Sequence, residues 1–316
     1  MANCDNLFRV FNSDLQIEKG KLASLKTSND FAREKIRKYF KDEHPDYTPF
    51  FRRQGSSVTK NRIRTKDNTC DQDDGVYFKK NPDNVTGTTL QKWVKEALDG
   101  ITEASPSHRK KCVTLEYKAE YSIDFPVFVF DEQSDEHPML AIKDGDFRED
   151  DPKEFIDEFK RVKDKEGQLI RITRYLKAWC DHKREKMPSG IAMTVLAMRH
   201  LQKNDRDDVA LKFTLIEIER VLKLNFQCVM PTTPKDDLFG DYDETRRENF
   251  MSNLASFKAD AKTAVDEENN QLKASRLWQK HLGKTYFPDG KDEDQDTSGR
   301  EAMKSVIGTS KPYFEK

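Results

Sequence analysis

Two aspartates separated by one residue are the most informative chemical feature of the chain. Asp71 and Asp73 belong to the segment Asp71-Gln72-Asp73-Asp74-Gly75. Side chains alternate between the two faces of a β-strand, so these two carboxylates project from one face together. Like charges held that close repel each other unless a cation lies between them, and Mg²⁺ suits a site made of carboxylate oxygens. Taken alone, a D-x-D pair is also typical of a solvated acidic turn or a calcium loop.

A third aspartate lies in an otherwise apolar segment. Asp124 interrupts the run from Tyr121 to Phe130, which is rich in β-branched and aromatic residues, as a buried strand is. A charge in such a strand is costly without a partner. In two-metal phosphoryl transfer, ions roughly 3.5–4 Å apart clamp the attacking and leaving oxygens. We therefore predict a catalytic metal site made of Asp71, Asp73 and Asp124, for Mg²⁺ or, as the alternative ion, Mn²⁺.

A glycine–serine pair upstream of the acidic strand could hold phosphate. A turn built on Gly55 and Ser56 lets backbone N–H groups and a hydroxyl approach phosphate oxygens closely. Such pairs are common in proteins, and only the acidic strand that follows makes this one informative.

The second half of the chain offers cations at helical spacing. Arg171, Arg174 and Lys177 recur every three residues within 171–182 and could point into a triphosphate cleft, although a solvated basic face explains them too. Ser189 precedes an apolar helix, where capping alone explains it, but a helix N-terminus is also a good phosphate site. The opposite side of the 171–182 helix is an apolar stripe of Ile172, Tyr175, Leu176 and Trp179.

The elements that must position these residues predict an α+β protein. Residues 1–50 are mostly helical in pattern, and from about residue 150 onward only helical periodicity is readable. We predict residues 1–150 as a core with an N-terminal helix, and residues 151–316 as a helical lobe with an acidic loop near 289–299. Within the core we expect strands at 76–78, 113–117 and 121–130 and a helix at 88–98 packed on their sheet.

The composition describes a folded protein without a basic excess. The 316 residues include 20 Phe, 9 Tyr and 3 Trp, too many aromatics for a disordered chain. Lys and Arg number 56 against 57 Asp and Glu, so binding of duplex nucleic acid is not expected. Five widely spaced cysteines without a CxxC pair predict free thiols in a reducing cytosol rather than a zinc site. No segment approaches the roughly 20 apolar residues that span a bilayer, so we expect a cytoplasmic protein without a membrane partner.

These residues resemble the nucleotidyltransferase signature h-G-[GS]…D-h-[DE]-h…D. The extended form Q-G-S…D-x-D-D-G-h-Y-h is similar to that of the bacterial cGAS/DncV-like nucleotidyltransferases (CD-NTases), which synthesise cyclic oligonucleotides in anti-phage (CBASS) defence. The resemblance continues in the helical half at 174–179, at 188–189 and at 278–288. It covers about residues 50 to 288, most of the chain.

The resemblance implies a polymerase-β-like nucleotidyltransferase core with a mixed sheet and an all-helical lobe like that of oligoadenylate synthases, with the active site in the cleft between them. It implies that ATP and GTP are joined with release of pyrophosphate, and cyclic GMP-AMP is the product we favour. By matching motif positions, Asp71 and Asp73 would bind Mg²⁺, and Asp124 would help to activate the acceptor hydroxyl. The donor triphosphate would be contacted by Gln54, Gly55 and Ser56 from the core and by Lys177 and Ser189 from the helical lobe.

Two other functions remain as alternatives. A linear nucleotidyltransferase, of the oligoadenylate or tailing type, would use the same acidic residues, but a tailing enzyme should have a basic extension that this neutral chain lacks. A non-catalytic nucleotide-binding protein is the other alternative, and the presence of all three aspartates argues against it. The bases joined, the linkage, the ring size, the oligomeric state and the need for a regulatory partner protein are not readable from the sequence.

Overall fold

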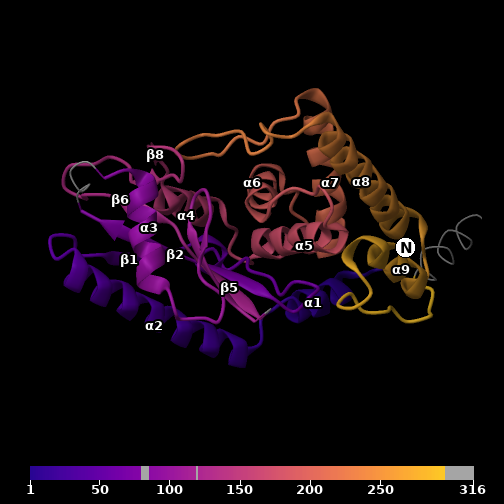
Figure 1. The fold of residues 1–316 in the computed structure, drawn as a ribbon. Helices are drawn as coiled ribbons and strands as arrows, with labels where there is room; N and C mark the ends of the chain where they lie inside the picture. The colour runs from indigo at the N-terminus through magenta and orange to yellow at the C-terminus, as the bar shows by residue number, and fades with distance from the viewer. Residues whose placement is uncertain (80–84, 119, 296–316) are drawn as a thin grey trace, which may run out of the picture.

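The computed structural model describes residues 1–79, 85–118 and 120–295, which form two lobes side by side (Figure 1). The core lobe contains an eight-stranded sheet with helices α2 (Lys19–Glu43) and α3 (Gly87–Leu98). Its strands are β1 (Phe50–Gln54), β2 (Cys70–Phe78), β3 (Ser107–His108), β4 (Val113–Tyr117), β5 (Tyr121–Phe125), β6 (Val127–Val129), β7 (Met139–Ala141) and β8 (Phe147–Glu149). The sheet is mixed, as predicted for the core of an α+β protein.

Strand β2 lies at the centre of this sheet. The order is β3-β4-β5-β2-β6-β7-β8, and β1 pairs with β2 in antiparallel orientation. The predicted strand Tyr121–Phe130 runs parallel to β2 but is divided into β5 and β6 at Pro126, which has no N–H to donate. The carbonyl of Pro126 still accepts a hydrogen bond from the Val76 N–H at 2.9 Å, so the strand stays attached to β2 across the break.

The alternation of side chains gives β2 two different faces. Val76 and Phe78 belong to the apolar core that also contains Ile36 and Phe40 of α2, so this face is covered by helix. Asp71 and Asp73 stand an odd number of residues away and therefore lie on the opposite face. That face looks toward the second lobe.

The helical lobe is built around α5 (Gln168–Lys183). The apolar stripe predicted on this helix is buried, and Trp179 and Trp278 are each 1% exposed, in agreement with their prediction as core residues. The other helices of the lobe are α1 (Asp5–Asp14), α4 (Pro152–Val162), α6 (Gly190–His200), α7 (Asp207–Leu224), α8 (Glu244–Lys262) and α9 (Gln271–Leu282), with the π-helical turn η2 (Thr263–Glu267) between the last two.

Helix α1 packs differently from the predicted division of the chain. We expected residues 1–150 to form the core, but the Phe8 ring of α1 lies 5.0 Å from the Tyr175 ring and 4.9 Å from the Trp278 ring, both in the helical lobe. The helical pattern of residues 1–50 predicted helix here but not the surface against which α1 packs. The chain thus begins on the helical lobe, crosses to the core before α2, and returns at α4.

The segment between α7 and α8, residues 225–243, reaches back toward the core lobe and is called the crossing loop below (Figure 1, orange). Its Asp236 forms an ion pair with Arg148 of β8. Its Thr233 hydroxyl lies 3.2 Å from His137 Nε2, and the Thr233 N–H donates to Glu154 at 2.8 Å. The two lobes therefore touch at this end of the molecule as well.

The predicted acidic loop near 289–299 lies in part within the described chain. Through residue 295 it is attached to the start of α9, where the Leu272 N–H donates to the Lys291 carbonyl at 2.9 Å and the Gln271 N–H donates to the Glu293 carbonyl at 3.1 Å. Residues 296–299 lie outside the described residues. Among the described helices, none combines the length and the apolar character required to cross a bilayer.

Candidate active site

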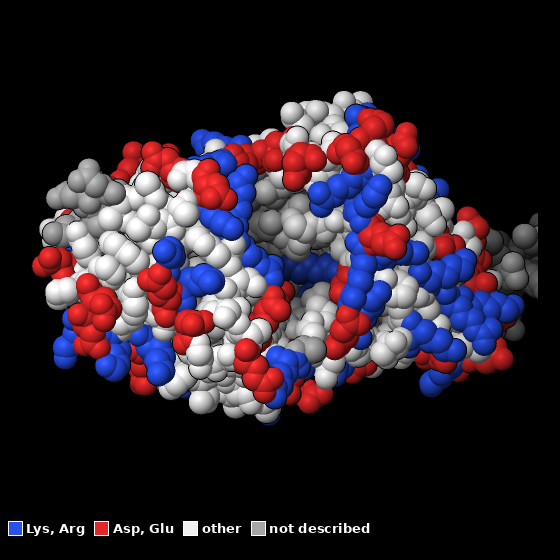
Figure 2. Space-filling view, viewed as in Figure 1, with Lys and Arg blue, Asp and Glu red and all other residues white. Residues whose placement is uncertain are grey.

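A cleft of about 830 Å³ separates the two lobes. Figure 2 shows it as a hollow with Lys and Arg side chains in its depth and acidic side chains near its edges. The cleft brings together all the site residues predicted from the sequence, and its lining includes Gln54, Gly55, Ser56, Asp71, Asp73, Asp124, Lys177 and Ser189.

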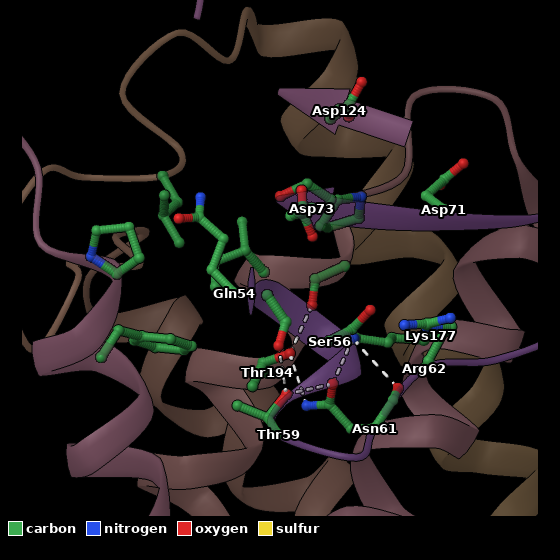
Figure 3. Close-up of a pocket in the computed structure, with 18 of the residues that line it drawn as sticks. Gln54, Ser56, Thr59, Asn61, Arg62, Asp71, Asp73, Asp124, Lys177 and Thr194 are labelled. Carbon is green, nitrogen blue, oxygen red and sulfur yellow. Dashed lines mark hydrogen bonds between the residues drawn. The ribbon is translucent and has the colours of Figure 1, made fainter. Parts of the chain in front are cut away.

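The three aspartates come from two neighbouring parallel strands. Asp73 of β2 stands in register with Asp124 of β5, and Asp71 stands in register with Ser122. The Ser122 hydroxyl donates to Asp71 Oδ1 at 2.7 Å, and the Thr114 hydroxyl of β4 donates to Asp124. All three carboxylates thus lie on the face of the sheet that borders the cleft (Figure 3).

The fold holds these carboxylates under mutual repulsion. Burial, followed by the negative charges of Asp124 and Asp71, raises the pKa of Asp73 to about 6, against the opposing effect of Lys177. Burial also raises the pKa of Asp124, although the hydrogen bond from Thr114 opposes this. A divalent cation would relieve the repulsion, and carboxylate oxygens are among the hard ligands that such cations take in proteins. The residues present therefore fit a site for a divalent cation.

The turn that follows β1 lies against the acidic strand. Gly55 has φ +65°, and a Cβ at this position would stand 2.0 Å from Asp73 Oδ2. Glycine is therefore required here both for the backbone conformation and for the close approach to the carboxylate. Gln54 Oε1 accepts a hydrogen bond from the Tyr77 hydroxyl at 3.3 Å. The Ser56 hydroxyl lines the cleft and has no hydrogen-bond partner among the described residues.

One of the three predicted cations of α5 faces the cleft. Lys177 Nζ donates to Asn61 Oδ1 at 3.0 Å and to the Asn61 carbonyl at 3.3 Å. Burial lowers the pKa of Lys177 to about 7, against the opposing effect of the negative charge of Asp73. The ammonium is thus a half-buried group at the boundary between the lobes.

The other two cations have structural partners, so the expectation that they point into the cleft is wrong. The Arg171 guanidinium forms an ion pair with Asp207, 2.6 Å from Nε to Oδ2, and Asp207 is fully buried. Arg174 donates to Asn12 at 2.9 Å and to the Lys60 carbonyl at 2.7 Å. A period of three residues differs from the 3.6 of a helix, so such a series turns away from any one direction along the axis.

Ser189 begins α6 at the edge of the cleft. Its hydroxyl accepts a hydrogen bond from the Ala192 N–H at 3.4 Å, which is the geometry of a helix N-cap. The side chain is exposed, and the cleft lies beside it. Capping and phosphate binding are thus both available to this residue.

Sequence analysis missed several of the polar residues that line the cleft. Thr59, Asn61 and Arg62 follow the Gly55 turn, and Thr194 lies on α6. Nε and Nη1 of Arg62 are buried and have no hydrogen-bond partner in the described part of the chain. The segment that holds the first three has neither helical nor strand periodicity, so only its position after the Gly–Ser pair could have drawn attention to it.

Comparisons with known proteins agree with this geometry. Residues 49–128 match the family model described as "Cyclic GMP-AMP synthase DncV-like, nucleotidyltransferase domain". A curated protein named cyclic GMP-AMP synthase, from Escherichia albertii, is 25% identical over 245 residues, which make up 68% of this chain and 53% of that protein. The chain therefore spans about half the length of this curated relative.

Solved structures show the same fold over both lobes. Vibrio cholerae DncV, a cyclic AMP-GMP synthase described as a prokaryotic cGAS homologue, aligns with a TM-score of 0.79 at 16% identity, covering 92% of this chain and 98% of that one. Escherichia coli DncV bound to 3'-deoxy GTP aligns with a TM-score of 0.71 at 19% identity, covering 87% of this chain and 94% of that one. The chain thus has the fold of DncV, and its residues 49–128 match the model of the DncV-like nucleotidyltransferase domain.

Proposed function

We propose that this protein is a Mg²⁺-dependent cyclic dinucleotide synthase that joins ATP and GTP into cyclic GMP-AMP and releases pyrophosphate. One observation carries the proposal: three carboxylates from two paired strands face a half-buried lysine of the other lobe across a single cleft. That arrangement suits phosphoryl transfer, where positioning and electrostatic stabilisation account for most of the catalysis.

Asp71, Asp73 and Asp124 would hold the metal. When bound, Mg²⁺ would polarise the phosphoryl oxygens and offset the charge that develops on them. Asp124, which stands on the neighbouring strand, would orient the acceptor hydroxyl and take its proton. Ser122 and Thr114 hold Asp71 and Asp124 through hydrogen bonds, so both carboxylates have fixed orientations.

The donor triphosphate would lie between the Gly55 turn and the helical lobe. Ser56 supplies a hydroxyl without a partner in the described chain, and Lys177 and Ser189 approach from the opposite side. The partnerless donors of Arg62 are a further match for phosphate oxygens, because buried donors without acceptors are costly. Binding of an anion would thus satisfy groups that the protein alone leaves unsatisfied.

The reaction would occur twice to close a ring. In each step the 3′ or 2′ hydroxyl oxygen of one nucleotide forms a bond to the α-phosphorus of the other. The bond from that phosphorus to pyrophosphate breaks, and the hydroxyl proton moves to Asp124. Two nucleotides joined in both directions retain no triphosphate, so the product resists phosphatase.

The resemblance and the names of the relatives support the choice of substrates. The Escherichia albertii relative is named for cyclic GMP-AMP, and DncV structures contain GTP analogues or ATP with GTP. On the same grounds we propose a role in cytoplasmic anti-phage (CBASS) signalling, with a regulatory partner protein as one route of activation.

The test is direct product analysis. Purified protein would be incubated with Mg²⁺ and all four nucleoside triphosphates, treated with phosphatase, and its products identified by mass spectrometry. A phosphatase-resistant cyclic product is expected from the wild type and from Asp99→Asn, an exposed aspartate after α3, but not from the Asp71→Asn/Asp73→Asn variant. Only linear oligomers would favour the linear nucleotidyltransferase, and nucleotide binding without any product would favour the non-catalytic protein.

A further inference from the structure

Asn61 is a buried polar residue at the contact between the two lobes. It is 1% exposed and lies in the segment that connects the Gly55 turn to β2. Its side-chain oxygen accepts hydrogen bonds from the Thr59 hydroxyl at 2.9 Å and from Lys177 Nζ at 3.0 Å. Its side-chain nitrogen donates to the Thr194 hydroxyl at 3.4 Å. The amide is therefore bonded at both ends, as a buried amide must be to offset its loss of water.

These contacts link the Gly55 turn to two helices of the other lobe (Figure 3). On the core side, the Thr59 N–H donates to the Gly55 carbonyl at 3.3 Å, so Asn61 is connected to the turn through Thr59. On the helical side, Lys177 belongs to α5 and Thr194 to α6. A displacement of either helix would therefore move a hydrogen-bond partner of Asn61.

The position of the Lys177 ammonium depends on this residue. Both hydrogen-bond acceptors of Lys177 Nζ in the described structure belong to Asn61, one on the side chain and one on the backbone. The neighbouring cations of α5 are committed elsewhere, Arg171 to Asp207 and Arg174 to Asn12. A lysine side chain with four rotatable bonds loses considerable entropy when fixed, and Asn61 offsets that loss before any ligand binds.

We propose that Asn61 is a positioning residue that holds the Lys177 ammonium beside the Gly55 turn and so prepares it to bind the triphosphate. The inference rests on the proposed function, because it takes Lys177 as a ligand of the nucleotide phosphates. Preorganisation of this kind acts on affinity: an ammonium that is already in place costs less to order when the nucleotide arrives.

A double-mutant cycle tests the proposal. Asn61→Leu replaces the amide by an apolar side chain of similar size, and Lys177→Met removes the ammonium while keeping a long apolar stem. We expect each single variant to raise the KM and the Kd for ATP with Mg²⁺ about tenfold or more, as for hydrogen bonds to charged groups. If Asn61 acts through Lys177, the double variant equals Lys177→Met alone, because the ammonium is already gone. If the two effects multiply, Asn61 acts independently and the proposal is wrong.

Two further variants separate positioning from general packing. Thr194→Val removes the contact of the amide nitrogen and should raise the KM less than Asn61→Leu does. An equal effect would mean that Asn61 acts by joining the lobes and would overturn the proposal. Asn225→Ala, an exposed asparagine after α7, is the matched control and should leave both the KM and the melting temperature unchanged.

The outcomes also separate this proposal from the proposed function. A folded wild-type protein that neither binds ATP nor forms product would overturn both. Effects that multiply, in a protein that does bind ATP, would overturn only the role of Asn61.

Discussion

Two adjacent aspartates on opposite faces of strand β2 have opposite electrostatic surroundings. Asp74 points toward α2, where it is fully buried and forms an ion pair with Arg33, with 2.6 Å from Asp74 Oδ2 to Arg33 Nε, and accepts from Asn29 at 2.9 Å. Asp73 points toward the cleft, where burial, followed by the negative charges of Asp124 and Asp71, raises its pKa to about 6. Asp74 is thus paired with a cation of the fold on one face of the strand. Asp73, one position earlier, is placed beside other carboxylates on the opposite face.

The difference distinguishes a structural charge from a functional one. A buried charge that serves stability is paired and hydrogen-bonded by the protein itself. A charge that is held close to like charges lowers the stability of the fold unless a ligand of opposite charge binds. Groups whose pKa values are perturbed in this way are common at functional sites. On this basis the same substitution in Asp73 and in Asp74 should have opposite consequences.

The largest effect is expected for Asp73→Asn. Loss of a metal ligand should reduce the rate of product formation on the order of 10³-fold or more, because a bound cation supplies several kcal/mol of charge stabilisation. The substitution also removes a charge that repels Asp124 and Asp71, so the melting temperature should stay the same or rise. Initial rates and thermal unfolding would be measured on the same preparation. A clear fall in melting temperature would show that Asp73 has a structural role like that of Asp74.

Asp74→Asn should do the reverse. It leaves the Arg33 guanidinium without its charged partner and should lower the free energy of unfolding by about 3 kcal/mol, the lower end for a buried pair because Arg33 remains 19% exposed. Urea unfolding would measure this loss. Below the unfolding transition the folded fraction should keep its activity within a few-fold. An inactive but stable variant would show that Asp74 acts in catalysis rather than in stability and would contradict the comparison.

Gly55→Ala should come next, with Gly100→Ala as its control. Both glycines have positive φ, +65° and +73°, so alanine carries a similar backbone cost at each. A Cβ at Gly55 would lie 2.0 Å from Asp73 Oδ2, whereas one at Gly100 would have nothing within 4 Å. Displacement of the catalytic carboxylate should lower kcat/KM about 100-fold in Gly55→Ala only. Equal losses in both variants would attribute the effect to the backbone rather than to Asp73.

The smallest effect is expected for Arg62→Met, which extends the comparison to cations. Arg62 has buried donors without partners in the described chain, whereas Arg171 is paired with Asp207. Loss of the Arg62 guanidinium should weaken the binding of ATP about tenfold, the value of a hydrogen bond to a charged group, and leave stability almost unchanged. Arg171→Met should lower stability and leave the Kd of the folded protein unchanged. Isothermal titration calorimetry of both variants with ATP and Mg²⁺ would measure the Kd, and thermal unfolding would measure stability. A weaker Kd in Arg171→Met, or a clear loss of stability in Arg62→Met, would contradict this assignment of roles.

Local patterns in the sequence were sufficient to predict much of the fold. The period of two on β2 placed Asp71 and Asp73 on one face, and the apolar run from Tyr121 predicted the neighbouring strand that carries Asp124. The stripe on α5 predicted its buried side. What could not be predicted was non-local: residues 1–50 were expected to be mostly helical, but the packing of α1 on Tyr175 and Trp278 depends on residues more than 160 positions away.

The candidate site was predictable where its residues follow a motif and not where they depend on the contact between lobes. All eight predicted residues line one cleft. Asn61 and Arg62 were missed because their burial arises only when the helical lobe covers a segment without periodicity. The two interpretations of Arg171, in the cleft or on a solvated face, could not be decided because its partner, Asp207, lies 36 residues later in the chain.

The course of the chain also restricts how the cleft can open. The lobes are joined covalently both between α1 and α2 and between β8 and α4. A body attached to another at two points turns most easily about the line through them and resists sliding or twisting in other directions. Domain movement should therefore be a hinge rotation about the axis through the two connections. Its angle would set the distance between Lys177 and the acidic strand.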